Sequence, residues 1–283
     1  MPAPTAFRLT VNGVDLQLYE WPGAEPAAFF VHATGFHARC WDQVIANLPG
    51  RRCIAIDMRG HGLSSKPPPP YPWTNFGEDV AGLLRALGLR DAIGVGHSKG
   101  GFAVTWAAAE VPGAFRALLL IDPVILAQEA YGMARGTGEH FAAKRRNAWA
   151  SPEEMVTRFA SRSPFDRWQP AVLRDYCRYG LVPDAAGDGY ILACPPEIEA
   201  AAYAGSAGSL AIYDRIPMVG VPVRVLRAPQ VEGGPAANMS GSPTWPGLAA
   251  AFPRGEDMLL PGLTHFIPME DPAFVASQIA ELG

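Results

Sequence analysis

The chain has 283 residues, of which 49% are hydrophobic and 18% charged, and its net charge at pH 7 is −4. This composition is typical of a globular protein that is long enough to bury a sizeable core in one large or two ordinary domains. A slightly acidic chain lacks the basic surface that nucleic-acid binding needs, so we expect no nucleic-acid partner.

The amino-terminal stretch MPAPTAFRLTVNG has neither the basic region nor the apolar segment of a signal peptide. No stretch reaches the roughly 18 to 20 continuous apolar residues of a membrane-spanning helix. We therefore expect a cytoplasmic protein without a membrane span. The cysteines have neither the spacing of a zinc site nor that of a disulfide framework, so we expect four free thiols: Cys40, Cys53, Cys177 and Cys194.

The first predicted elements form a hairpin. Residues 7–11 and 14–21 alternate between apolar and polar side chains, and Asn12-Gly13 between them favours a tight turn. The apolar run over 27–32 then predicts a strand buried on both faces. Helices and buried strands alternate after it, and the expected ranges are 41–48 (helix), 52–56 (strand), 73–87 (helix), 91–96 (strand), 101–110 (helix), 115–121 (strand), 221–226 (strand), 257–260 (strand) and 273–282 (helix).

This alternation predicts an α/β fold with a mostly parallel central sheet flanked by helices and a site at the carboxyl ends of the strands. The strand pattern is interrupted after residue 122, where helical segments rich in arginine and aromatic residues follow. We expect a core formed by 1–122 and 214–283 and an inserted helical cap over 123–213. Most of the cap's aromatic residues should form its own core and some should line a pocket: Phe141, Trp149, Phe159, Phe165, Trp168, Tyr176 and Tyr179.

The pentapeptide Gly96-His97-Ser98-Lys99-Gly100 lies between a predicted strand and a predicted helix. Glycines two residues before and after the serine let the neighbouring chain pass a strained strand-to-helix turn. Such a turn exposes the serine hydroxyl, and the helix that follows aims its first amides at a developing oxyanion. The GxSxG pattern alone also occurs in ordinary turns, so the other motifs decide its interpretation.

Asp122 and His265 each follow another predicted strand, and with Ser98 they give the order nucleophile, acid, histidine. A serine needs an imidazole to accept its proton, and the imidazole needs a carboxylate that fixes its tautomer. The three residues therefore compose a candidate triad. His37 and His61 have no carboxylate at metal-ligand spacing, so we expect no metal site.

The chain resembles the α/β-hydrolase fold superfamily in four motifs that stand in the superfamily's order. They are Val31-His32-Ala33-Thr34-Gly35-Phe36, Asp57-Met58-Arg59-Gly60-His61-Gly62-Leu63-Ser64, Gly96-His97-Ser98-Lys99-Gly100-Gly101 and Leu263-Thr264-His265-Phe266-Ile267-Pro268-Met269-Glu270. The resemblance implies that Ser98 is the nucleophile and His265 the general base. It also implies an oxyanion hole formed by the backbone amides of Thr34 and Lys99. His32, His97, Asp57 and Arg59 are interpreted as supports of these loops.

The acid departs from the superfamily's usual position, which is the loop after the strand at 221–226. Glu232 is the carboxylate available in that loop. Part of the superfamily instead carries the acid after the strand that follows the nucleophile helix, where Asp122 stands. We assign Asp122, because its short side chain starts from a strand end with little freedom, and we keep Glu232 as the alternative.

The side chain of Lys99 is a second departure, because methionine or glutamine is common after the nucleophile. A cation at this position either lowers a neighbouring pKa or extends to solvent, and we favour an extension to solvent.

The resemblance implies hydrolysis of a carboxylic ester through an acyl-enzyme, without a cofactor, and the cap favours a small-molecule ester with an apolar or aromatic part. Residues 130–180 carry nine Lys/Arg against five Asp/Glu, which also favours an anionic substrate. Hydrolysis of a lactone, a thioester or a carbon–carbon bond stays open. The alternative from another class is a non-catalytic receptor or scaffold with this fold.

Overall fold

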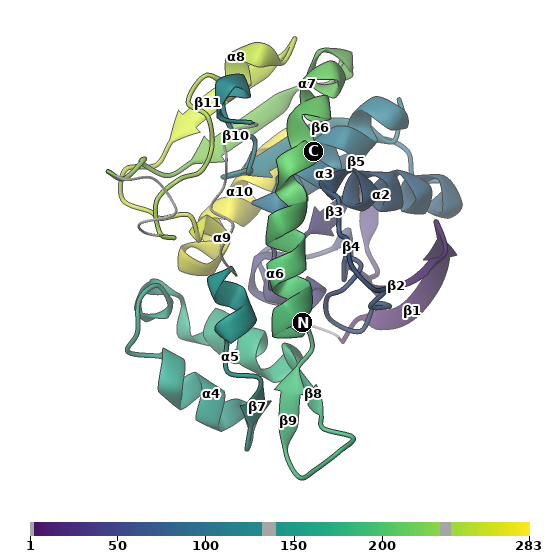
Figure 1. The fold of residues 1–283 in the computed structure, drawn as a ribbon. Helices are drawn as coiled ribbons and strands as arrows, with labels where there is room; N and C mark the ends of the chain where they lie inside the picture. Colours follow the sequence, from purple (N-terminus) through teal and green to yellow (C-terminus); the bar gives the residue numbers. More distant parts are fainter. Residues whose placement is uncertain (1–2, 132–139, 233–238) are drawn as a thin grey trace.

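The computed structural model describes residues 3–131, 140–232 and 239–283 (Figure 1). Within these residues an eight-stranded sheet has the order β1-β2-β4-β3-β5-β6-β10-β11. Its strands are β1 (Thr5–Val11), β2 (Val14–Trp21), β3 (Ala24–Val31), β4 (Arg51–Ile56), β5 (Ala92–His97), β6 (Phe115–Ile121), β10 (Val223–Arg227) and β11 (Gly255–Leu259). Strand β2 pairs antiparallel with both its neighbours, and every other pair in the sheet is parallel. The predicted α/β fold with a mostly parallel sheet is confirmed.

The register of the central strands brings their carboxyl ends to one edge. Val31 of β3 pairs with Gly96 of β5, and His97 at the end of β5 pairs with Ile121 at the end of β6. Ile121 in turn pairs with Leu226 of β10. The residue after each of these strand ends therefore lies at the same edge, which is where a parallel sheet carries its site.

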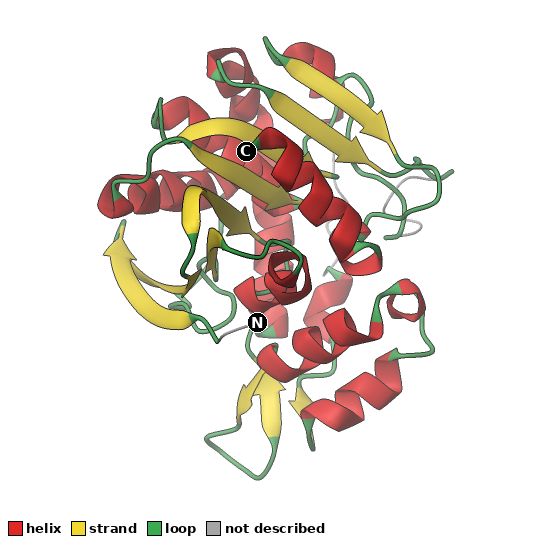
Figure 2. Cartoon of the chain, turned by 180° about the vertical axis from the view of Figure 1, so that it is seen from behind, coloured by secondary structure: helices red, strands yellow, loops and turns green. Residues whose placement is uncertain are grey.

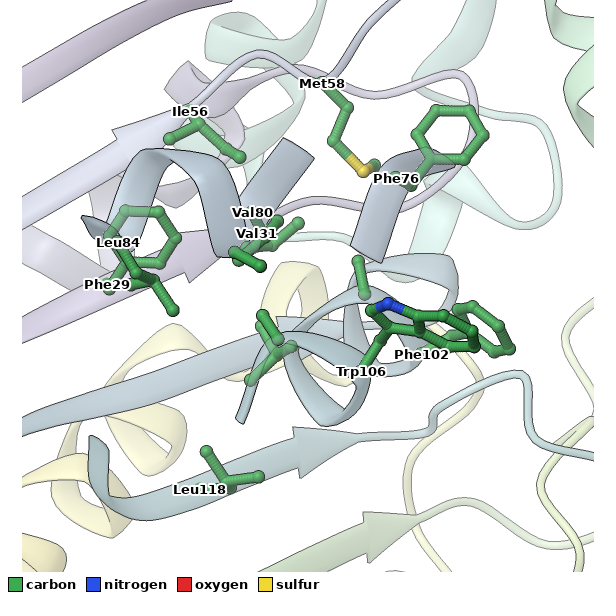
Figure 3. Close-up of a cluster of buried hydrophobic side chains, with 14 of the residues drawn as sticks. Phe29, Val31, Ile56, Met58, Phe76, Val80, Leu84, Phe102, Trp106 and Leu118 are labelled. Atoms are coloured by element: carbon green, nitrogen blue, oxygen red, sulfur yellow. The ribbon is translucent and has the colours of Figure 1, made fainter. Parts of the chain in front are cut away.

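Helices cover both faces of this sheet (Figure 2). On one face α2 (Trp73–Leu87) packs against α3 (Lys99–Glu110), and on the other α1 (Asp42–Ala46) packs against α10 (Pro272–Leu282). The buried stretches of the central strands are mostly apolar because helices cover both faces of the sheet there. Figure 3 shows the cluster between the sheet and the first pair of helices, with the labelled side chains Phe29, Val31, Ile56, Met58, Phe76, Val80, Leu84, Phe102, Trp106 and Leu118.

The region predicted as a helical cap contains a small sheet as well as helices. Figure 1 shows α4, α5 and this sheet gathered beside one edge of the large sheet. The elements of the region are α4 (Pro152–Phe159), α5 (Pro170–Tyr179), α6 (Pro196–Ala204), α7 (Ile212–Arg215) and the strands β7 (Ala148–Trp149), β8 (Leu181–Pro183) and β9 (Tyr190–Leu192), which pair in the order β7-β9-β8. The prediction of a region without strands was wrong, because strands of two or three residues are too short to show an alternating pattern.

Two short helices complete the described chain, α8 (Leu248–Ala251) and α9 (Ile267–Glu270). All four cysteines are buried and free, as expected. In the described part of the chain, none of the helices is long and apolar enough to cross a membrane.

Truncation of a buried aromatic residue of the core should lower the free energy of unfolding strongly. Phe29 of β3 is fully buried, and its ring centroid lies 6.3 Å from that of Phe115. Phe29→Ala should lower the free energy of unfolding by about 3 to 5 kcal/mol, because a cavity replaces the ring. Leu259→Ala is the control, since Leu259 is 45% exposed, and it should cost less than about 0.5 kcal/mol. Urea unfolding of both variants measures the difference, and equal costs would contradict this account of the core.

Candidate active site

Ser98 lies between β5 and α3 in a backbone conformation that an L-residue rarely adopts, with φ of 57° and ψ of −121°. The glycines around it permit close packing of the turn. A Cβ atom on Gly96 would lie 2.5 Å from the carbonyl oxygen of Gly100, and one on Gly100 would lie 2.1 Å from that of Val31. Both positions therefore exclude any side chain. The strained backbone at Ser98 costs about 1 to 3 kcal/mol, and the packing of β5 and α3 on either side maintains it.

The structure brings together the three side chains that the sequence singled out. Nε2 of His265 lies 3.1 Å from Oγ of Ser98, and Nδ1 of His265 lies 2.6 Å from Oδ2 of Asp122. Ser98 is 6% and His265 8% exposed, while Asp122 is fully buried. An acceptor carboxylate fixes the proton on Nδ1, so Nε2 is free to accept the hydroxyl proton of Ser98.

The carboxylate of Asp122 is held by partners from the loop after β10. Its Oδ1 accepts hydrogen bonds from the amide of Ala228 at 3.0 Å, from the Ser242 hydroxyl at 2.6 Å and from the Thr244 hydroxyl at 3.3 Å. Asp122 itself has a φ of 44°. Sequence reasoning missed Ser242 and Thr244, because they are far from Asp122 along the chain and no local pattern distinguishes them from other loop residues.

Glu232, the alternative acid, lies in the same loop after β10 and is exposed. The hydrogen bond from Nδ1 of His265 goes to Asp122 instead.

A second histidine supports the backbone of the first. Nε2 of His97 lies 2.8 Å from the carbonyl oxygen of His265, an acceptor, so Nε2 carries the proton. Burial lowers the pKa of His97 to about 3, and the imidazole is therefore neutral at physiological pH. This bond fixes the loop that carries His265.

The loops after β3 and β4 are joined by buried polar groups. His32 donates from Nδ1 to the carbonyl of Ala33 at 2.7 Å and accepts at Nε2 from the amide of Met58 at 3.0 Å. Asp57 accepts from the amides of Ala38 and Leu63 at 2.7 and 2.8 Å. Burial raises the pKa of Asp57 to about 6. These contacts are those of loop supports, as predicted for His32 and Asp57.

Arg59 is anchored to helix α2. Its guanidinium donates two hydrogen bonds of 2.6 Å to the carboxylate of Asp79. The predicted supporting role of Arg59 agrees with this bidentate pair, which is buried and holds the loop after β4 against the helix.

The two residues predicted to form the oxyanion hole lie in the loop after β3 and at the start of α3. Thr34 is buried in the loop after β3, and the strand ends pair Val31 with Gly96. Lys99 is the first residue of α3, so its amide has no partner within the helix and stands at the positive end of the helix dipole.

The side chain of Lys99 does not reach solvent, and the prediction that it does was wrong. Lys99 is fully buried, and its Nζ lies 3.6 Å from the centroid of the Phe76 ring. Among the described residues Nζ has no hydrogen-bond partner. The pKa of this amine falls to about 7, because burial disfavours the charged form. Helix α2 packs against α3, and its Phe76 ring covers the amine of Lys99.

A cavity of about 330 Å³ is lined by Thr34 and by Phe266, the neighbour of His265, whereas Ser98, Asp122 and His265 themselves lie outside its lining. Its walls include most of the aromatic residues predicted for the cap, which are Phe141, Trp149, Phe159, Phe165, Trp168 and Tyr176. These rings pack on one another and also line the cavity. The expectation that most of them form a core and only some line a pocket therefore separated two roles that the same rings combine. Tyr179 lies outside the lining, and the guanidinium carbon of Arg39 lies 3.9 Å from its ring centroid.

No cluster of three or more potential metal ligands occurs among residues 3–131, 140–232 and 239–283.

A mostly parallel eight-stranded sheet, flanked by helices and carrying a strained serine between β5 and α3, defines the α/β-hydrolase fold. The sequence matches the alpha/beta hydrolase family over residues 28–278, and the chain therefore belongs to this family.

The relatives of the chain include hydrolases. It is 35% identical to the 2-(acetamidomethylene)succinate hydrolase of Mesorhizobium japonicum over 116 residues, which are 41% of each chain. It is 36% identical to a bifunctional esterase/perhydrolase of Acinetobacter calcoaceticus over 106 residues, 36% of this chain and 38% of that one. The matches thus span less than half the length of these relatives. A crystal structure of an E-2-(acetamidomethylene)succinate hydrolase aligns over 99% of this chain and 98% of its own, with a TM-score of 0.76 and 22% identity.

The buried amine predicts a stability that depends on pH. An unfolded lysine keeps its ordinary pKa of 10.5, so between about pH 7 and 10.5 residue 99 binds its proton more fully in the unfolded chain than in the folded one. The contribution of Lys99 to the free energy of unfolding therefore rises with pH in this window. Lys99→Met removes the buried charge and should be more stable than the wild type below pH 7, by on the order of 3 kcal/mol.

This advantage should shrink as the pH approaches 10, because the wild-type amine is then neutral in the folded state. Urea unfolding of both proteins at pH 6, 8 and 10 measures it. Titrating groups that do not interact with Lys99 contribute equally to both proteins, so their effects cancel in the difference. A difference that stays constant with pH would refute the buried, titrating amine.

Proposed function

We propose that the protein is a serine hydrolase that cleaves a carboxylic ester through an acyl-enzyme. The observation that carries the proposal is the chain of hydrogen bonds from Ser98 through His265 to the buried carboxylate of Asp122, at 3.1 and 2.6 Å. A serine at the start of a helix, an imidazole of fixed tautomer and a carboxylate are the parts that acyl transfer requires.

In this mechanism Ser98 Oγ attacks the ester carbonyl while Nε2 of His265 accepts its proton. Asp122 stabilises the imidazolium that forms. The amides of Thr34 and Lys99 bind the oxyanion, and each such donor contributes about 10²- to 10³-fold to the rate. His265 then protonates the leaving alcohol. Water, deprotonated by His265, attacks the acyl carbon. The bond between that carbon and Oγ of Ser98 then breaks, Oγ recovers the proton from His265, and the carboxylic acid is released.

We further propose that residues 123–213 form a cap over a core of 1–122 and 214–283, and that the cap selects a substrate with an apolar or aromatic part. The aromatic walls of the cavity support this preference. Phe159 and Phe165 stack with ring centroids 4.4 Å apart and an interplanar angle of 5°, and Trp168 meets Phe165 edge-on at 4.8 Å. Such walls favour flat or extended apolar groups over polar ones.

The esterase/perhydrolase relative supports the ester among the substrates that this chemistry allows. A lactone, a thioester or a carbon–carbon bond would use the same nucleophile and base. A scaffold without activity would have no need for a strained serine hydrogen-bonded to a histidine, and that feature favours an enzyme over a receptor.

Replacement of the nucleophile tests the proposal directly. Ser98→Ala should lower the kcat for 4-nitrophenyl esters at least about a thousandfold, because the covalent path is lost. The variant should also lose labelling by a fluorophosphonate. Circular dichroism and the midpoint of thermal unfolding should match the wild type, since only one hydroxyl is removed. A variant that folds normally and keeps a tenth of the wild-type turnover would exclude the serine mechanism.

The identity of the acid is tested by a matched pair of isosteric variants. Asp122→Asn should lower kcat by about 10³- to 10⁴-fold, because the amide favours the wrong tautomer of His265. Glu232→Gln removes the same charge from an exposed position and should change kcat less than about twofold. Steady-state kinetics on one ester decide between them. The assignment of Asp122 fails if Glu232→Gln is the impaired variant.

A further inference from the structure

Two arginines at the cavity form no ion pair with the described residues, although Arg158 is close enough to Glu154 to interact with its charge. Arg158 lies in the last turn of α4, Arg162 lies in the turn that follows, and both line the cavity. Both side chains are exposed, and among the described residues neither makes a side-chain hydrogen bond or an ion pair. Their guanidinium groups are therefore available to a ligand.

The other two arginines of the lining are already engaged. Arg145 pairs with Glu199 and donates to the hydroxyl of Tyr176 at 2.9 Å. Arg146 pairs with Glu154 at 2.6 Å. Glu199 is the one acidic side chain among the described lining residues, and Arg145 neutralises it. The cavity thus keeps an excess of positive charge at Arg158 and Arg162.

Aromatic residues line the same cavity as these two charges. Phe159 follows Arg158 directly, and Phe165 lies three residues after Arg162 in the sequence. The two rings stack on each other, and both line the cavity with Trp168. An apolar wall with a cationic rim fits a molecule whose middle is apolar and whose far end is anionic. A carboxylate matches a guanidinium in shape and charge, since the two planar groups pair through parallel hydrogen bonds.

We propose that the substrate is an ester that carries a carboxylate on its acyl part, remote from the scissile bond, and that Arg158 and Arg162 bind this carboxylate. The proposal rests on the proposed serine-hydrolase function and names the substrate class for it. The apolar segment between the ester and the carboxylate lies against the aromatic wall. The positive rim also attracts the anion before it binds, so the preference weakens as salt screens the charges.

Arg158 has a structural role available as well, because a cation in the last turn of a helix stabilises the helix dipole. Arg162 lies beyond the end of α4 and lacks this role. A purely structural contribution would change the stability of the protein or the turnover of all esters alike. Binding of a carboxylate instead changes the preference between charged and neutral esters.

The experiment compares two series of 4-nitrophenyl esters. One series contains the monoesters of succinate, glutarate and adipate. The other contains neutral esters of equal length, in which an isopropyl group replaces the free carboxylate. The readout is the ratio of kcat/KM for the charged ester to that for its neutral counterpart. In the wild type this ratio should be greatest at one chain length and should fall as sodium chloride is raised.

Arg158→Gln and Arg162→Gln should each lower this ratio by about threefold, and the double variant by about tenfold, as expected for exposed charge pairs. Arg174→Gln is the control: it removes one exposed positive charge from α5, outside the cavity lining, and should leave the ratio unchanged.

A ratio that is the same in the double variant and the wild type would overturn the proposed substrate class. The proposal would also be overturned if Arg174→Gln lowered the ratio as much as Arg158→Gln and Arg162→Gln do. The effect would then come from the net charge of the protein and not from binding in the cavity. The Ser98→Ala variant distinguishes a failure of the proposed substrate class from a failure of the serine mechanism. If Ser98→Ala abolishes turnover of both series, the hydrolase function stands whatever the arginine variants show.

Discussion

The site depends on one buried carboxylate. Asp122, at the end of β6, accepts hydrogen bonds from Ala228 and Ser242 in the loop after β10 and from His265 in the loop after β11. A buried anion without partners costs several kcal/mol, so these bonds must form together for the fold to tolerate it. The same requirement holds the three loops in one arrangement. The carboxylate that orients His265 is thus also the group that fixes the position of the loop carrying it.

The parallel sheet makes this convergence possible. The ends of β5, β6 and β10 pair in register, so residues far apart in the sequence emerge at one edge. The glycines around Ser98 then let α3 begin so close to β3 that no side chain fits between them. The strain at Ser98 is a local cost, and the extensive burial of the strands and helices around it offsets that cost.

Most of the sheet, and the positions of Ser98, Asp122 and His265 at its carboxyl edge, were predictable because their signals are local. Apolar runs mark buried strands, and Gly96 and Gly100 mark the turn at Ser98. The contacts of Asp122 with Ser242 and Thr244 were not predictable, since they join residues that share no sequence pattern. The burial of Lys99 was missed for a related reason: an isolated lysine on a helix does not reveal that α2 packs over it. The strands of the cap escaped detection because they are so short.

The charge of Lys99 also affects two buried histidines, His32 in the loop after β3 and His61 in the loop after β4. Burial lowers the pKa values of His32 and His61, and the nearby amine lowers both further. A neutral His32 has one ring nitrogen that donates and one that accepts, as its bonds to Ala33 and Met58 require. Protonation would turn the accepting nitrogen into a donor and break the bond from Met58. Burial and the Lys99 amine thus oppose protonation of His32, so the two loops stay joined across neutral pH.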